Sequence, residues 1–256
     1  MATERGNPRA QRTRAALIAA GRRLYSERPV DAVTVDDIVQ AAAVGKGSFY
    51  NHFADRDALV RAISSEIRGH VEAAITRANV GVEDPARRMA RAVCTYLRFA
   101  LDGAEASGVL VRVHSGHTSL SAPLNRGLVE DIETGLATGR FAVPTVEAGV
   151  LYVLGVTQLA LVRVVQEPTL AVAVSLSQQM CALTLRGLGV PNAEADLIAA
   201  QASDEIVRRG AFSAPDATAP AAHRPPGAAG EMPPPGPASV ALPKGLTRIS
   251  VEGRTP

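Results

Sequence analysis

The sequence of 256 residues contains only two cysteines, Cys94 and Cys181. Two widely spaced cysteines do not provide the disulfide framework of a small secreted protein. Each cysteine lies in an apolar pattern with helical spacing, so we expect both to be core residues with free thiols. This usage indicates a protein that folds in a reducing compartment.

Long apolar runs are absent as well. The most apolar stretch, Val150 to Val165, is interrupted by Gln158 and Arg163, and it is shorter than the roughly 20 residues that cross a bilayer. The N-terminus carries arginines with no apolar run behind them, unlike a signal peptide. We therefore expect a cytoplasmic protein with no membrane partner.

The alternating pattern of β-strands is missing too. Ala, Leu, Arg and Glu dominate the sequence, and hydrophobic residues make up 46% of it, which is enough for a buried core. These features predict an all-α fold. Beyond residue 81 we expect six helices, most of them beginning near a proline: about 84–102, 105–118, 123–138, 144–166, 168–188 and 193–209.

The composition changes at Ser213. The last 44 residues hold 10 of the 17 prolines and show little apolar periodicity. This predicts a Pro-rich disordered tail over 211–256, which folding would not require. An interaction peptide within the tail is the alternative.

The net charge of +2 excludes a whole-chain polycation, but the charge is unevenly distributed. Residues 1–30 hold seven arginines and two glutamates, a local net charge of +5. A basic segment on a nearly neutral protein suits a polyanionic partner, although a solvated helix surface has the same composition.

Local signals divide residues 8–79 into four helices. Asn7-Pro8 predicts the start of the first helix, and Pro29 ends it. Thr34 is the expected N-cap of the second, with Asp37 completing a variant capping box. That helix runs to about Ala42, a third covers about 45–51, and a long fourth covers about 55–79.

The segment VGKGSFYNHF, residues 44–53, spans the third helix and contains the only lysine of the first 243 residues. It is not a phosphate loop, because Gln40 stands where the first glycine of that motif belongs and Gly47 stands where a hydroxyl belongs. The third glycine of a dinucleotide fingerprint is also missing. His52 has no neighbouring ligand, and His114 and His117 lack a third, so we predict no metal or cofactor site.

On a helical wheel Phe49 and Phe53 share one face of this segment, which can pack on the preceding helices. Gly47 and Asn51 fall nearly opposite. The hydrogen-bond donors Lys46, Ser48, Tyr50 and His52 flank them. Such a helix can enter a DNA major groove, where Asn51 could read a base and the flanking side chains could contact phosphates. An ordinary helical hairpin with exposed polar residues is the alternative.

The stretch TVDDIVQAAAVGKGSFYNHFADRDAL, residues 34–59, resembles the DNA-binding signature of the TetR family of bacterial transcriptional regulators. The match covers about residues 12–63. It implies a three-helix helix-turn-helix domain over 1–53, with the motif at about 34–53, and a helical effector-binding and dimerisation domain over 54–210. The DNA contacts that it implies are Thr34, Lys46, Gly47, Ser48, Tyr50, Asn51, His52 and Arg56.

Three positions depart from the family pattern. Ala43 stands where the turn usually has glycine, Gly45 replaces the usual serine cap, and Pro29 replaces the glycine after the first helix. If the turn needs a left-handed residue, alanine costs about 1 kcal/mol there.

The resemblance also implies a homodimer that binds palindromic double-stranded operator DNA and releases it, as a repressor, when a small effector binds. The helices at 144–188 are the best dimer candidates, because one chain cannot easily bury both of them; a monomeric core is the alternative. Their outward-facing candidates are Val146, Val150, Leu154, Leu161, Leu176 and Leu183.

The effector site is expected within about 84–160, where an apolar set with a few polar groups is available. Its candidates are Tyr96, Phe99, His114, His117 and Gln158. The sequence offers no plausible nucleophile–base pair or carboxylate dyad, so we predict no enzyme activity. A helical small-molecule-binding protein or enzyme without a DNA role is the alternative function.

Overall fold

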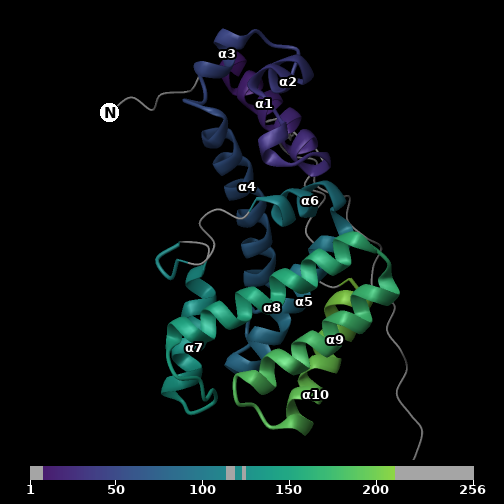
Figure 1. The fold of residues 1–256 in the computed structure, drawn as a ribbon. Helices are drawn as coiled ribbons and strands as arrows, with labels where there is room; N and C mark the ends of the chain where they lie inside the picture. Colours follow the sequence, from purple (N-terminus) through teal and green to yellow (C-terminus); the bar gives the residue numbers. More distant parts are fainter. Residues whose placement is uncertain (1–7, 114–118, 123–124, 211–256) are drawn as a thin grey trace, which may run out of the picture. The chain divides into compact units, whose positions relative to one another are not determined.

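A computed structural model of the chain describes residues 8–113, 119–122 and 125–210, which all belong to one compact unit within Met1–Ala219. His114, His117 and the predicted tail lie outside the described residues. The described part is helical and contains no strand, which confirms the predicted fold class (Figure 1).

The N-terminal helices follow their local signals closely. Pro8 is the first residue of α1, and the capping box between Thr34 and Asp37 is present at the start of α2. The elements of this part are α1 (Pro8–Glu27), η1 (Val30–Ala32), α2 (Val35–Ala41) and α3 (Lys46–Tyr50).

A small core holds these helices together. Leu17 and Tyr25 of α1, Ile38 of α2 and Phe49 of α3 are fully buried. Gly21 of α1 allows α4 to approach closely, because a Cβ at this position would lie 2.8 Å from Cδ1 of Ile63. α3 is thereby held by its Phe49 side, and its other side is left to solvent.

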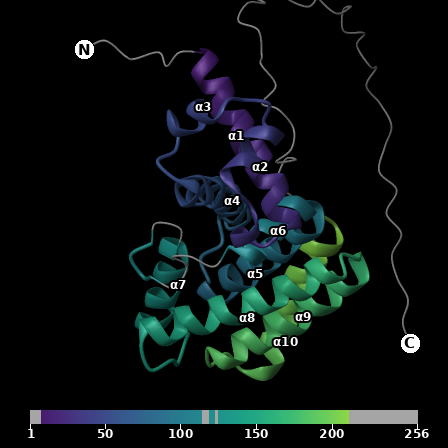
Figure 2. The same cartoon turned by 45° about the horizontal axis from the view of Figure 1, so that its top comes forward.

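The long helix α4 (Arg56–Ala78) leads from this group into the remaining helices (Figures 1 and 2). Asp55 caps it by accepting from the N–H of Ala58. The later elements are α5 (Pro85–Asp102), α6 (Ala104–Arg112), α7 (Arg126–Ala137), α8 (Val146–Gln166), α9 (Leu170–Gly187), α10 (Asn192–Ala202) and the π-helical turn η3 (Ser203–Arg208).

α5 is the central helix of the second group and packs against α4, α7, α8 and α9. Its N-cap, Asp84, also accepts from Arg140, and Arg140 donates to Glu194 of α10. One guanidinium therefore ties the start of α5 to the start of α10.

Two helix boundaries differ from the sequence expectation. α6 ends at Arg112 instead of about 118, and α7 begins at Arg126 instead of about 123. The two cysteines behave as predicted: Cys94 and Cys181 are free and buried, with 3.5 Å between their sulfur atoms.

Candidate functional sites

The turn between α2 and α3 contains a left-handed residue, the condition under which the departure of Ala43 from the family pattern has an energetic cost. Ala43 has φ of +53° and is the only non-glycine residue with a positive φ in the described part of the chain. The N–H of Ala43 donates to the carbonyl of Gln40, and the N–H of Val44 donates to that of Val39. This bond pair is a Schellman motif, which usually has glycine at the position of Ala43.

α3 begins without a side-chain cap. Gly45 occupies the N-cap in an extended conformation, and no side chain accepts a hydrogen bond there. The helix then lasts five residues and ends before Asn51, which is its C-cap, whereas the sequence predicted a helix over about 45–51. The N–H of Asn51 donates to the carbonyl of Gly47.

The outer side of α3 is polar and open. Lys46, Gly47 and Asn51 are exposed, and a Cβ at Gly47 would meet nothing within 4 Å. Tyr50 is 53% exposed, although its ring packs edge-on against that of buried Phe49. Ser48 and His52 are half-buried, and exposed Thr34 lies at the start of the neighbouring α2.

The two cations predicted to meet phosphates already have partners. Lys46 Nζ lies 2.8 Å from Asp36 Oδ1, a contact that raises the pKa of the lysine. Arg56 donates to the carbonyls of Val33 and Asp31 and to the Asp31 carboxylate, at 3.3 to 3.5 Å. Arg56 therefore also fixes the start of α4 against the segment before α2.

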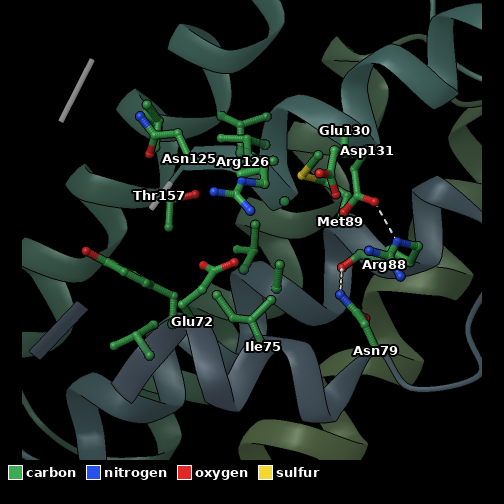
Figure 3. Close-up of a pocket in the computed structure, with 18 of the residues that line it drawn as sticks. Glu72, Ile75, Asn79, Arg88, Met89, Asn125, Arg126, Glu130, Asp131 and Thr157 are labelled. Carbon is green, nitrogen blue, oxygen red and sulfur yellow. Dashed lines mark hydrogen bonds and ion pairs between the residues drawn. The ribbon is translucent and has the colours of Figure 1, made fainter. Parts of the chain in front are cut away.

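A cavity of about 710 Å³ lies among α4, α5, α7 and α8 (Figure 3). Its volume is within the usual range of small-molecule sites. Most of its wall is apolar, and the apolar lining residues include Val71, Ile75, Met89, Val93, Leu128 and Leu154.

One group of polar lining residues is largely paired within the chain, although Asn79 Oδ1 is buried without a hydrogen-bond partner. Arg88 donates through Nε to Asp131 and through Nη1 to the carbonyl of Val82. Asn79 Nδ2 donates to the carbonyl of Arg88. Burial raises the pKa of Asp131 although the contact with Arg88 lowers it.

A second group of polar lining residues is incompletely paired. Within the described residues, no ion pair involves Arg68, Glu72 or Arg126. Nε and Nη2 of Arg68 and Oγ1 of Thr157 are buried without a hydrogen-bond partner. Burial lowers the pKa of Arg68, although a side-chain hydrogen bond with Tyr96 acts in the opposite direction. Burial, together with Asp131 and Glu130, raises the pKa of Glu72.

The cavity contains part of the predicted effector set. Tyr96 and Gln158 line it, whereas Phe99 is buried in the core and is not among the lining residues. Sequence reasoning missed Arg68, Glu72 and Arg126. The first two were detectable in principle, because they are four residues apart on α4 beside the apolar positions Ile67, Val71 and Ile75.

The described residues include no group of three or more metal-ligating side chains that could hold an ion.

By length and composition α8 is apolar enough to cross a membrane. Its most apolar 18-residue stretch has a mean hydropathy of 1.8, and 33% of that stretch is buried in the structure. From the shorter apolar run, Val150 to Val165, we expected no segment long enough to cross a membrane, whereas the whole helix α8 is long enough.

The outer faces of α8 and α9 carry exposed leucines. Leu159 is 72% exposed and Leu183 is 50% exposed, and Leu151 and Leu170 are exposed as well. Val150 and Leu161, which the sequence suggested for this surface, are instead buried within the chain.

Two family profiles match the chain. Residues 17–63 match the bacterial regulatory proteins of the tetR family, and residues 84–201 match the tetracyclin repressor-like C-terminal domain. No curated protein sequence matches the chain.

Solved structures resemble the chain over most of its length. RolR in complex with resorcinol is 29% identical with a TM-score of 0.60, over 75% of this chain and 95% of RolR. A tetR-family regulatory protein from Rhodococcus RHA1 is 23% identical with a TM-score of 0.52, over 73% of this chain and all of that one. A gamma-butyrolactone receptor, an ArpA-like protein, is 20% identical with a TM-score of 0.53, over 78% of this chain and all of that one.

Proposed function

Since the chain belongs to the tetR family of bacterial regulatory proteins and is a transcription regulator with a helix-turn-helix, we propose that it is a repressor. In this proposal a cytoplasmic homodimer binds a palindromic operator and releases it when a small molecule enters the cavity. Residues 1–53 contact DNA, and residues 54–210 bind the effector and the second copy. We assign no catalytic activity.

The observation that carries this proposal is the course of α4. Its first residue, Arg56, is hydrogen-bonded to the segment that precedes α2, and its second half contributes Arg68, Glu72 and Ile75 to the cavity. A molecule in the cavity therefore contacts the same helix that supports the helix-turn-helix.

The exposed side of α3 supports direct contact with DNA. Asn51 and Gly47 face solvent, and their surroundings allow close approach of a base edge. Thr34, Lys46, Ser48, Tyr50, His52 and Arg56 surround them and are proposed to contact the sugar-phosphate backbone. Lys46 and Arg56 would exchange their present acidic partners for phosphate oxygens.

The exposed leucines of α8 and α9 support a dimer through about 144–188. Two copies packing these faces together would form a four-helix bundle, which buries the leucines that one chain leaves exposed. The two copies of α3 must then lie about 34 Å apart to reach successive major grooves.

Release follows from a shift between conformations. A ligand that prefers a conformation with a different spacing of the α3 helices lowers DNA affinity by its preference between the two states. The complex of RolR with resorcinol, a structure of similar fold, supports a small organic molecule as the effector class.

Binding isotherms on promoter DNA next to the protein's own gene test this function. Arg56→Ala should weaken binding to all DNA and reduce the salt slope by about one unit, because one fewer counterion is released. Asn51→Ala should leave that slope nearly unchanged and cost about 1–3 kcal/mol on the cognate operator alone.

The two variants also separate the possible errors. Equal losses by Asn51→Ala on the cognate operator and on one altered at the contacted base pair would refute base reading by Asn51. If neither variant changes DNA binding while both stay folded, the regulator function itself fails and a small-molecule-binding protein without a DNA role becomes the better assignment.

A further inference from the structure

The polar lining of the cavity indicates the chemistry of the molecule that it binds. The structure describes seven buried side-chain N and O atoms without a hydrogen-bond partner, and four of them belong to cavity residues: Arg68 Nε and Nη2, Asn79 Oδ1 and Thr157 Oγ1. Buried polar atoms in folded proteins are nearly always paired, so a cluster of exceptions around one cavity points to partners supplied by a ligand.

Thr157 lies on one side of the cavity, near Glu72 and Arg126, whereas Asn79 lies on the other side, beside Arg88 (Figure 3). Glu72 and Arg126 extend into the cavity from α4 and α7, and Thr157 projects from α8 beside them (Figure 3). The Glu72 carboxylate reaches the start of α7, where a Cβ on Gly127 would lie 3.2 Å from its Oε1. On the other side, Arg88 and Asp131 are bonded to each other and to neighbouring groups. Asp131 is therefore already paired, whereas Glu72, which forms no ion pair among the described residues, is open to a ligand head group.

The side of the cavity lined by Arg68, Glu72, Arg126 and Thr157, called the open side below, requires both a hydrogen-bond donor and an acceptor from the ligand. Arg68 can only donate, and an ionised Glu72 can only accept. Although they are four residues apart on one face of α4, they form no ion pair with each other in the described structure. A carboxylate head would satisfy Arg68 but would bring a second negative charge beside Glu72. One hydroxyl oxygen, by contrast, can accept from the guanidinium and donate its hydrogen to the carboxylate.

We propose that the cavity binds a neutral, apolar molecule with a hydroxylated head, whose hydroxyl is held between Arg68 and Glu72 with Arg126 and Thr157 as further partners. This inference rests on the proposed effector role of the cavity. The apolar body of the molecule lies along Ile75, Met89 and Leu154, and the pair of Arg88 and Asp131 closes the far end.

Calorimetric titration of the full chain with three probes tests the head group. The probes are 5-pentylresorcinol, its dimethyl ether and decanoate, which share an apolar tail but present donors, acceptors alone, or a negative charge. We expect 5-pentylresorcinol to bind at least about tenfold more tightly than either other probe, since the ether cannot donate to Glu72. Equal or tighter binding of the ether or of decanoate, or no binding of the phenol at millimolar concentration, would overturn the assignment.

Two substitutions test the residues. Glu72→Gln and Arg68→Met should each weaken binding of 5-pentylresorcinol by about tenfold, because each removes a charged hydrogen-bond partner, and should change binding of the ether much less. Glu66→Gln and Arg77→Met, on exposed positions of α4 outside the cavity lining, are the matched controls and should change neither. Equal losses for the phenol and the ether would overturn the roles of Arg68 and Glu72.

Stability and DNA binding are measured on the same proteins. The unliganded Arg68→Met variant should melt no lower than the parent, because it removes two guanidinium nitrogens that are buried without a hydrogen-bond partner. The unliganded Glu72→Gln variant should also melt no lower, because it removes a partly buried charge that has no ion-pair partner among the described residues. A lower melting temperature of either variant would overturn this account of Arg68 and Glu72. Release of operator DNA is a separate readout. If 5-pentylresorcinol binds as expected but leaves the DNA complex intact, the proposed release mechanism fails and the assignment of the head group stands.

Discussion

Replacing Ala43 by glycine should stabilise the protein, although glycine usually destabilises. Ala43 is the C-terminal left-handed residue after α2, with φ of +53°, and its side chain is exposed. Its methyl group therefore contributes little packing to offset the strain of this backbone conformation.

The expected size follows from two opposing effects. A left-handed conformation costs an L-residue with a Cβ about 1–2 kcal/mol, and glycine avoids most of this cost. Glycine also gives the unfolded chain more freedom, which costs about 0.4–1 kcal/mol. The net effect of Ala43→Gly is a gain of about 0.5–1 kcal/mol in the free energy of unfolding, or about 2 °C in Tm for a chain of this size.

Urea unfolding at a fixed protein concentration measures this gain. Ala41→Gly is the matched control, because Ala41 is the last helical residue of α2 and glycine there should cost about 0.5–1 kcal/mol. Two identical substitutions two residues apart are thus expected to have opposite signs. If Ala43→Gly lowers the unfolding free energy as much as Ala41→Gly does, the strain argument for this turn is refuted.

Three further substitutions test packing, charge and assembly. Gly135→Ala should destabilise the protein by about 1–3 kcal/mol, because its Cβ would lie 2.0 Å from the ring of Phe141, while Gly69→Ala, with open space around it, should not; thermal melts of both check this. Arg140→Met should cost about 1 kcal/mol at neutral pH. Burial raises the pKa of Asp84, but the hydrogen bonds from Arg140 and from the start of α5 together outweigh this effect, so that the pKa of Asp84 is lowered overall. Arg140 also lowers the pKa of Glu194. The carboxylates therefore contribute to stability above their unfolded pKa, and this contribution is lost as the pH falls through their lowered folded pKa values. The unfolding free energies of parent and variant, measured in urea, should converge below about pH 4. A difference between them that persists in acid would contradict this. Leu159→Asp should shift sedimentation from dimer to monomer, whereas Leu197→Asp, also exposed but on α10, should not.

Features set by neighbouring residues were predictable from the sequence. The cap at Thr34 and the start of α1 at Pro8 each depend on a few adjacent positions, and both are present. The left-handed residue at Ala43 was raised only as a condition, by comparison with the family pattern. The weak start of α3 at Gly45 was also visible. The early end of α3 was not, because a five-residue helix depends on the packing of Phe49 and Phe53 more than on its own propensity.

Features that join distant segments could not be read from the sequence. The pair of Arg88 and Asp131 spans 43 positions, and the cavity collects side chains from four helices. Asp36 lies in the first turn of α2, and nothing in the sequence showed that Lys46 would pair with it. Val150 and Leu161 looked suited to the dimer surface, yet they are buried within the chain, where α8 packs against α5, α6, α7 and α9.

The incompletely paired lining of the cavity also bears on how long the protein lasts in a cell. Proteases degrade chains that open, and a molecule that binds only the folded state makes opening rarer in proportion to its occupancy. Two nitrogens of Arg68 and the hydroxyl of Thr157 have no hydrogen-bond partner in the empty cavity, so under the proposed effector role the unliganded protein is the shorter-lived form. Pulse-chase labelling should therefore show the regulator accumulating when its effector is abundant, which gives the cell a reserve of the protein at the moment the effector begins to fall.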